Sequence, residues 1–364
     1  MITAVLLVLP CLGFCDPPRS MTDSLGTKVT LPTPIDHAIG SGSGCLRIIT
    51  YLRAQDKIVA VDDIETRKNR FDARPYALAN PQFKKLPIFG EFRGHDHPER
   101  IVGLTPLPQI ILKTFSTMGV DPVELHQKTG IPVVTIEYGD LGHQRQTFFK
   151  ALEIAGQALN RETRAQAVIA FFKAQIAELE KRTAGVSNPP TCFVGGIAYK
   201  GPHGFQSTEP GYPPFQFIHA VNVAATPESM GGKMTRSTIS KEKLMVWDPD
   251  VLFLDLSTLR MGGAGGLSEL KNDPAFQSLT ALKHGRIFGV LPYNSYAQNF
   301  GSILANAWFI GKVLYPERFT DIDPAKKADE IYTFLVGRPM FKTMDARFSD
   351  LAFKQIDLNQ GEEG

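Results

Sequence analysis

Side chains able to hold an anionic ligand gather in one irregular segment in the second half of the chain. Residues 195–209, GGIAYKGPHGFQSTE, follow a predicted strand and combine glycines with aromatic and polar residues. A long irregular loop after a strand usually carries function, although an ordinary surface turn is the alternative. The best candidates for contacting a ligand here are Tyr199, Lys200, His203 and Phe205.

Two further tyrosines follow the predicted strand 287–290. Tyr293 and Tyr296 lie in the loop just beyond it. Ligands of open α/β sheets bind at the carboxyl ends of strands, so we expect this loop and residues 195–209 to border one cleft.

Cationic side chains lie near many of the predicted strand ends and loops. Guanidinium groups bind carboxylate, catecholate and phosphate-like groups in bidentate geometry, so a cleft lined by them would favour an anionic ligand. A solvated surface charge is the alternative for each one alone. The group consists of Arg47, Arg70, Arg74, Arg93, Lys113, Lys200 and Arg236, from which we take Arg47, Arg74, Arg93, Lys200 and Arg236 as candidate ligand-binding residues.

A glycine-rich loop, Gly40-Ser41-Gly42-Ser43-Gly44, separates a predicted strand from a predicted helix. With Asp62 and Asp63 about twenty residues further on, it resembles a dinucleotide-binding fingerprint, but the third glycine comes one residue early. An exported α/β enzyme that uses this loop is therefore one alternative, and turnover with bound nucleotide would reveal it. We favour a loop that presents backbone N–H groups and Ser43 to an anion in the cleft.

Histidines and carboxylates offer a second alternative, a bare metal ion. His95-Asp96-His97 lies beside Glu91, and His203 with Asp255 or Glu209 would complete such a site from the second half of the chain. A capped, solvated turn at a helix start is the commoner role of a His-Asp-His run. We predict neither a direct metal-ligand set nor a cofactor.

Catalytic motifs are absent from the sequence. It contains no G-x-S-x-G, no H-E-x-x-H and no phosphate-binding Walker loop, which argues against an enzyme. The formal net charge of +2 over 364 residues is too small to indicate nucleic acid or an anionic membrane as partner.

The N-terminus indicates export. Residues 1–15 are mostly apolar and a polar run follows, which suits the hydrophobic region of a secretory signal but is too short to span a bilayer. No basic residue precedes Arg19, so the pattern is unusual. We predict a signal peptide over 1–20, with the mature chain starting between 15 and 21. Lipidation at Cys15 is a weaker alternative because Phe14 is large.

Strand-like and helical segments alternate from residue 28 onward, which predicts parallel α/β packing. One apolar stripe without Gly or Pro predicts a long helix over 160–183, with Asn160 as its N-cap. We therefore predict two Rossmann-like α/β lobes with mainly parallel sheets, joined by one long α-helix. The predicted segments are a lobe over 25–145, a helical segment with the bridging helix over 146–187, a lobe over 188–338 and an extension over 339–364.

The two predicted lobes share a local pattern. Glu99-Arg100-Ile101 is followed by Pro106 and an apolar strand, and Glu242-Lys243-Leu244 is followed by Pro249 and an apolar strand. In both copies the proline comes seven residues after the glutamate, which suggests two related lobes.

These features together resemble the iron-siderophore and cobalamin family of periplasmic substrate-binding proteins. Segment 97–106, HPERIVGLTP, is similar to the family's N-x-E-x-I-x-x-L-x-P-D segment, except that Leu107 replaces the final Asp. Segments 239–250 and 279–288 are similar to its second copy and to its L-x-A-L-K-x-G-R-V-Y run. The matches extend over roughly residues 25–315.

The resemblance implies a periplasmic or extracytoplasmic binding protein that serves an ABC importer. Its ligand would be a metal complex held between the lobes, with a ferric siderophore-like chelate as the first candidate. Phe92 and Arg93 fall where the family places a large side chain facing the cleft. Glu99 and Glu242 match its permease-docking glutamates, and the partners would be a permease with its ATPase. We expect a monomer.

Overall fold

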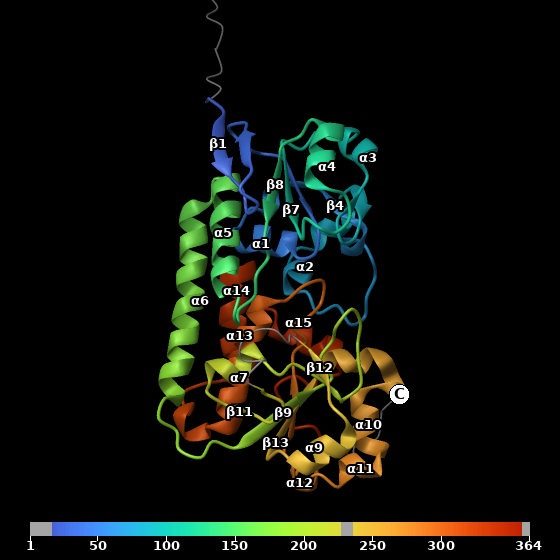
Figure 1. The fold of residues 1–364 in the computed structure, drawn as a ribbon, viewed down its shortest axis with the longest axis vertical. Coiled ribbons are helices and arrows are strands. Elements are labelled where there is room, and N and C mark those ends of the chain that lie inside the picture. The colour runs from blue at the N-terminus through green and yellow to red at the C-terminus, as the bar shows by residue number, and fades with distance from the viewer. Residues whose placement is uncertain (1–16, 227–235, 359–364) are drawn as a thin grey trace, which may run out of the picture.

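The computed structural model describes residues 17–226 and 236–358, which form two α/β lobes stacked along the long axis of the molecule (Figure 1). The N-lobe contains a six-stranded sheet in the order β6-β5-β4-β3-β7-β8. Its neighbours are parallel except β5 and β6. The strands are β3 Ala38–Ser41, β4 Ile58–Asp62, β5 Ile88–Glu91, β6 His95–Asp96, β7 Ile110–Thr114 and β8 Val133–Ile136.

The centre of this sheet is covered on both faces. Strands β3, β7 and β8 are buried along their whole length, as expected for apolar strands of a parallel sheet. A small cluster on one face joins Ile39 and Ile111 of the sheet to Ile101 of α3 (Pro98–Val102) and Leu125 of α4 (Pro122–Thr129). The other face joins the main core.

The C-lobe contains a four-stranded parallel sheet in the order β11-β9-β13-β14. The C-terminal segment continues it along β14, where the N–H of Gly289 donates to the carbonyl oxygen of Lys354 (3.0 Å) and that of Ile356 to Ile287 (2.9 Å). This pairing protects the sheet edge. The strands are β11 Val221–Asn222, β9 Thr191–Gly195, β13 Val251–Asp255 and β14 Ile287–Val290.

Two long helices connect the lobes on one side of the molecule. Helix α5 (Arg145–Leu159) packs against α6 (Glu162–Thr183), and α6 extends along both lobes (Figure 1). The prediction of a long bridging helix is correct, but Asn160 is not its N-cap. Asn160 has φ 56° and ends α5 in the left-handed conformation that favours a helix C-terminus.

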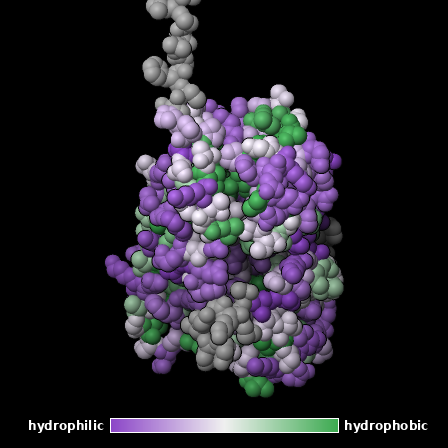
Figure 2. All heavy atoms as spheres, turned by 45° about the horizontal axis from the view of Figure 1, so that its top comes forward, coloured by the Kyte–Doolittle hydropathy of each residue, from purple (hydrophilic) through white to green (hydrophobic). Residues whose placement is uncertain are grey.

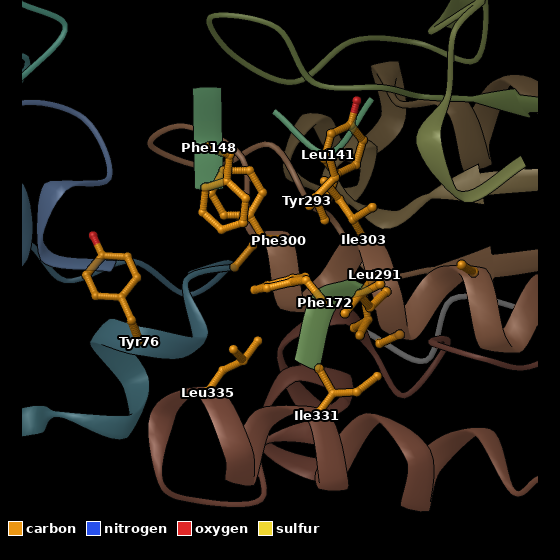
Figure 3. Close-up of a cluster of buried hydrophobic side chains, with 14 of the residues drawn as sticks. Tyr76, Leu141, Phe148, Phe172, Leu291, Tyr293, Phe300, Ile303, Ile331 and Leu335 are labelled. Atoms are coloured by element: carbon orange, nitrogen blue, oxygen red, sulfur yellow. The ribbon is translucent and has the colours of Figure 1, made fainter. Parts of the chain in front are cut away.

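A continuous hydrophobic core passes through the junction of the lobes. Figure 3 shows Phe148 from α5, Phe172 from α6 and Phe300 from α13 (Phe300–Leu314) close together, with Leu335 of α14 (Pro324–Val336) nearby. The ring centroids of Phe148 and Phe300 are 3.9 Å apart. All four side chains belong to one buried cluster that includes residues of both sheets. Closing or opening the lobes would disturb this packing, so large rigid-body motion is disfavoured.

Short elements complete the fold. Two small antiparallel sheets pair β1 (Arg19–Thr22) with β2 (Lys28–Leu31) and β10 (Ser207–Thr208) with β12 (Ser237–Thr238). The remaining α-helices are α1 Cys45–Tyr51, α2 Pro75–Ala79, α7 Pro213–Phe217, α9 Lys241–Trp247, α10 Gly266–Asn272, α11 Pro274–Gln277, α12 Thr280–Lys283 and α15 Phe341–Asp345. The 3-10 helices are η1 Gln55–Lys57, η2 Asp63–Glu65, η3 Pro81–Lys85, η4 Leu256–Ala264, η5 Pro316–Arg318 and η6 Ala346–Phe348.

The start of the folded chain bears on the predicted signal peptide, whose residues 1–16 lie outside the described residues. Arg19 and Ser20 belong to β1, where they pair with Leu31 and Thr30. The Arg19 guanidinium also donates to the carbonyl oxygen of Ala158 (2.7 Å). A signal ending at residue 20 would remove half of this strand, so we now expect cleavage before Arg19.

Candidate functional site

The loop between β14 and α13, residues 291–299, reaches from the C-lobe to the N-lobe, and we call it the junction loop. Arg47 on α1 donates to the carbonyl oxygens of Ser295 (3.0 Å) and Tyr296 (3.2 Å) and to the hydroxyl of Tyr138. Arg47 is only 1% exposed. Its guanidinium therefore holds the junction loop in place and is not available as the ligand-binding group predicted from the sequence.

The side chain of Tyr296 also connects the lobes by hydrogen bonds. Its hydroxyl donates to Asp62 at the end of β4 and accepts the N–H of Arg93 (3.0 Å). Burial, together with the neighbouring Asp62, raises the pKa of the Tyr296 phenol, which therefore stays protonated. Burial also raises the pKa of Asp62, and its Oδ1 has no hydrogen-bond partner within the described part of the chain.

Arg74, another predicted ligand residue, belongs to a buried ion-pair network. It is 3% exposed, and it donates to both carboxylate oxygens of Asp72 (2.9 Å each) and to Glu65 (3.0 Å). Its guanidinium is thus neutralised inside the N-lobe. We do not include it in the ligand site.

The turn that carries Phe92 and Arg93 is built on a buried lysine. Lys113 is fully buried and donates to Asp96 (2.6 Å), to Ser41 (3.1 Å) and to the carbonyl oxygen of Gly94 (3.1 Å). All three ammonium donors are used, so Lys113 supports the turn and does not face a ligand.

Phe92 and Arg93, which lie in the turn held by Lys113, remain partly exposed to solvent. Arg93 has φ 64°, its side chain is half-buried, and its guanidinium lies 5.2 Å from the centre of the Phe92 ring. Arg67 lies 4.8 Å from the same ring but forms an ion pair with Asp63. Among the described residues, no carboxylate pairs with Arg93.

A second cationic and aromatic cluster lies in the C-lobe, where the loop after β9 meets Arg236, the residue before β12. Arg236 lies over the ring of Tyr199 (5.4 Å) and donates to Ser207 (3.2 Å), and its Nη2 contacts Nδ1 of His203 (3.4 Å). Nε2 of His203 is 2.8 Å from the carbonyl oxygen of Tyr199, which places the ring proton on Nε2. Lys200 lies 5.6 Å from the same tyrosine ring. The structure thus brings together four of the predicted residues.

The remaining predicted ligand residues are buried in packing roles. Ser43 is 8% exposed, and its carbonyl oxygen accepts the hydroxyl of Thr114 (3.0 Å). A Cβ on Gly44 would lie 2.6 Å from the ring of Tyr138, so this glycine permits a close approach. Tyr293 is 2% exposed and packs on Tyr212 (5.7 Å). Phe205 is fully buried and packs on Phe193 (5.5 Å), so it belongs to the core and does not face a ligand. The glycine loop is therefore packed between neighbouring elements.

Two buried carboxyls stand at the C-lobe side of the junction. Glu209 follows β10 and Asp255 ends β13, and each has one oxygen without a partner among the described residues. Burial raises the pKa of Glu209 well above its usual range and that of Asp255 to about 7. The sequence suggested both only as alternative metal ligands. For Asp255, its place at the end of the apolar strand β13 was the signal that could have marked it as buried. Glu209 follows Ser207 and Thr208 and carries no such signal.

This geometry agrees with the comparison with known families. The sequence profile described as periplasmic binding protein matches residues 42–292, more than half of the chain. The chain is a periplasmic binding protein. The predicted family and the two-lobe α/β fold are therefore confirmed.

One relative in sequence and two solved structures show what this binding protein is similar to. It is 23% identical to the molybdate-binding protein MolA of Haemophilus influenzae over 86% of this chain and 90% of the relative. The solved structure of MolA bound to molybdate has a TM-score of 0.64 and 20% identity, and the match covers 87% of this chain and 98% of that one. A periplasmic solute binding protein from Veillonella parvula has a TM-score of 0.68 and 17% identity, with 92% and 97% covered.

A bare metal site is not assembled in the described part of this binding protein. No group of three or more His, Cys, Asp or Glu side chains there is placed to hold a metal ion. His95 is exposed on β6, and His97 lies 3.8 Å from Glu91 at the start of α3. His203 is engaged with Tyr199 and Arg236 instead.

The two glutamates predicted to dock the permease lie on separate lobes. Glu99 is exposed in the first turn of α3 and Glu242 in the first turn of α9, near opposite ends of the molecule (Figure 1). Hydrogen bonds from its own N–H and from Ser240 lower the pKa of Glu242, so it is anionic at neutral pH. Within the part of the chain that the structure describes, no helix has the length and apolarity needed to cross a membrane.

Proposed function

We propose that this protein is the extracytoplasmic binding protein of an ABC importer and captures an anionic ligand at the lobe junction. The observation that carries the proposal is the pair of cationic and aromatic clusters, Phe92 with Arg93 in the N-lobe and Tyr199 with Arg236 in the C-lobe. The junction loop contacts both clusters. The Tyr296 hydroxyl accepts the N–H of Arg93, and the Asn294 side chain donates to the carbonyl oxygen of Ala198, which precedes Tyr199.

The charge balance of these clusters supports an anion. Arg93, Lys200 and Arg236 form no ion pair with another described residue, whereas Arg74 and Lys113 do. Unpaired guanidinium groups beside aromatic rings can bind oxyanions by charge-assisted hydrogen bonds, and the rings limit competing water. His203 adds a polar contact.

The contacts between the lobes favour a small ligand. Arg47 and Tyr296 tie the lobes together, and the core is continuous across the junction. A small tetrahedral oxyanion, such as the molybdate bound by the relative MolA, fits this arrangement with little lobe movement. The ferric siderophore-like chelate predicted from the sequence is the second candidate, favoured by the aromatic faces of Phe92 and Tyr199.

Titration of the purified protein would test the ligand class. We expect calorimetry to detect binding of molybdate, and the Arg236→Ala and Arg93→Ala variants each to weaken it by about 1.5–3 kcal/mol. A matched control is Arg70→Ala, which removes an exposed arginine outside both clusters. Binding of a ferric catecholate chelate instead of molybdate would favour the second candidate. If neither anion bound, or if the three variants behaved alike, the proposed site would be wrong.

Delivery would use the two exposed glutamates. We propose that Glu99 and Glu242 meet cationic residues of the permease, which works with its ATPase. The Glu99→Lys/Glu242→Lys variant should bind ligand normally but lose uptake in cells, because like charges at an interface cost several kcal/mol. If the glutamates only stabilise helix N-termini, uptake by the variant stays normal and stability falls by less than about 1 kcal/mol.

A further inference from the structure

Two arginines outside the lobe junction meet beside helix α6. Arg53 lies just beyond the end of α1, and Arg164 lies in the first turn of α6. Both donate to the same acceptor, the carbonyl oxygen of Phe334 in the last turn of α14, and the distance from Arg53 is 3.1 Å. Because they share one oxygen, the two guanidiniums lie close together.

Each of these guanidiniums keeps donors that the described part of the chain does not use. Arg53 also donates to the carbonyl oxygen of Thr333 (2.7 Å), and Arg164 donates to that of Tyr51 (2.9 Å). Arg53 makes its bonds through Nη2, and Arg164 through Nε and Nη2, which leaves Nη1 of both groups unused by the described residues. Both arginines are half-buried. The remaining N–H groups can therefore bind an oxyanion that arrives from solvent.

The charges of the pair are not balanced by a carboxylate of the described residues. Arg182, at the other end of α6, shows the contrast, because Asp321 (2.6 Å) and Glu178 (2.9 Å) pair with it and raise its pKa. Burial, and after it the charge of Arg53, lowers the pKa of Arg164 to about 10. Burial also lowers the pKa of Arg53. The pair is thus a half-buried positive centre that a bound anion would stabilise.

A hollow in the surface reaches Arg164 from the start of α6. Its one carboxylate, that of Glu162, lies 3.8 Å from Nη1 of Arg19, and the hydroxyl of Thr163 adds a polar group. Hydrophilic side chains predominate on the α6 side of the molecule, at the left of Figure 2. The hollow is lined by Asn160, Arg161, Glu162, Thr163, Arg164 and Ala167.

We propose that Arg53 and Arg164 form a second anion site, separate from the two clusters at the lobe junction, and that this site binds a tetrahedral oxyanion of the phosphate type. The free Nη1 groups donate to the oxygens of the anion, while the bonds to the helix ends stay in place. The anion is either a free ion or the phosphate group of a lipid. The site does not depend on the importer function proposed above.

Stabilisation of helix ends does not by itself account for two arginines at this place. A cation near a helix C-terminus is favourable, and both groups bind carbonyl oxygens at such ends. One guanidinium would be enough for the oxygen of Phe334, however, and the second brings a like charge close to the first. A bound anion would offset that repulsion. The chain also makes room for the pair, because a Cβ on Gly337 would lie 2.1 Å from Nη1 of Arg53.

Titration with inorganic phosphate tests the site. Thermal unfolding of the mature protein is followed at rising phosphate and constant ionic strength, with chloride making up the difference. Because an anion that binds only the folded protein stabilises it, the unfolding midpoint should rise with phosphate. In Arg53→Met/Arg164→Met, which removes two charge-assisted donors, the phosphate concentration that gives half of the rise should increase at least about tenfold.

Three further variants serve as comparisons. Lys181→Met removes an exposed cation elsewhere on α6 and should keep the phosphate response. Arg236→Ala changes the C-lobe cluster at the junction and should also keep this response, although it weakens the junction site. Arg164→Lys keeps the charge without the planar fork, so it should weaken the response by less than the double variant does. It also replaces the double variant in the test if that variant does not fold.

The outcomes separate an anion site from a purely structural role. A lower midpoint in the double variant, with the same rise in phosphate as in the unmodified protein, would show that the arginines only stabilise helix ends and would overturn the proposal. A response lost in Arg236→Ala but kept in the double variant would place phosphate at the junction and overturn it as well.

Sedimentation with vesicles that contain phosphatidic acid identifies the source of the anion. Binding that requires Arg53 and Arg164 and occurs with these vesicles, but not with free phosphate, assigns the anion to a lipid headgroup and keeps the site. If the unmodified protein responded neither to phosphate nor to the vesicles, the proposed site would be wrong, and the importer function would be unaffected.

Discussion

Removing one hydroxyl, in Tyr296→Phe, should weaken the connection between the lobes. In the structure this hydroxyl donates to the buried Asp62 and accepts the N–H of Arg93 at 3.0 Å. Phenylalanine keeps the ring and its packing. The variant therefore removes the hydrogen-bond donor to Oδ2 of Asp62. The other carboxylate oxygen, Oδ1, already lacks a partner among the described residues.

The size of the effect follows from the charge state of Asp62. A hydrogen bond to a charged group contributes about 1.5–3 kcal/mol, and a buried group left unsatisfied costs about 1–3 kcal/mol. Protonation of the carboxyl relieves part of that cost. We therefore expect the free energy of unfolding to fall by about 2–4 kcal/mol where Asp62 is ionised in the folded protein, and by less at lower pH, where the carboxyl is protonated.

The direction of the pH dependence comes from the raised pKa of Asp62. Burial makes the folded protein hold this proton more tightly than the unfolded chain does. The stability that the bound proton provides is complete below the unfolded pKa of about 3.9 and is lost as the pH rises through the folded pKa. The Tyr296 hydroxyl lowers that folded pKa, so its removal raises the pKa further and the variant becomes less stable, relative to the unmodified protein, as the pH rises.

Urea unfolding at pH 5 and pH 8 measures these changes as shifts of the midpoint at constant m-value. Asp62→Asn supplies the other half of a double-mutant cycle, and we expect a coupling energy of about 1–2 kcal/mol between the two positions. Tyr199→Phe is the matched control, because Tyr199 is 41% exposed. It should lower the free energy of unfolding by less than about 0.5 kcal/mol. A cost of Tyr296→Phe that is the same at both pH values and in the Asp62→Asn background would refute this account.

Three further outcomes are expected. Burial raises the pKa of Asp255 to about 7. The stability that its bound proton provides should therefore be lost as the pH rises from about 4 to about 7. In urea titrations, Asp255→Asn should flatten the dependence of the free energy of unfolding on pH over that range. Gly44→Ala should lower the free energy of unfolding by about 2 kcal/mol or more, because φ is +76° and the added Cβ would lie 2.6 Å from Tyr138. Gly130→Ala should lower it by only about 1 kcal/mol in the same measurement, because φ is +70° but nothing lies within 4 Å of the added Cβ. Sequencing of the native N-terminus should find a start before Arg19, and a start after it would contradict the role of β1.

The regular elements could be predicted from the sequence because their signals are local. Apolar runs mark β7 and β13, and the apolar stripe marks α6. Elements of two to five residues, such as β11 and α7, carry no period of their own and form because their neighbours fix them. The break before α6 was predicted at the right place, but Asn160 was assigned to the wrong helix because it suits both a helix start and the left-handed end of a helix.

The candidate site was predicted less well because the partners of an arginine are set by tertiary structure. Arg47 lies between Leu46 and Ile48 and Arg74 between Ala73 and Pro75, so the neighbours in the sequence do not distinguish them. In the structure Arg74 pairs with buried carboxylates, and Arg47 with carbonyl oxygens of the other lobe. Arg236 meets only hydroxyls, a histidine and a ring among the described residues. The junction-loop partners of Arg47, Ser295 and Tyr296, are more than 240 positions away, which no local pattern reveals.

The contacts at the junction also limit how the protein can respond to its ligand. The same loop that connects the lobes, through Arg47 and Tyr296, lies beside both cationic clusters. A ligand drawing Arg93 toward itself would therefore act on the backbone that hydrogen-bonds Tyr296. With a continuous core behind the junction, such a change is easier to accommodate in the side chains and the junction loop than by rotation of whole lobes. Capture in this protein should thus depend on local rearrangement around Tyr296, with modest closure of the lobes.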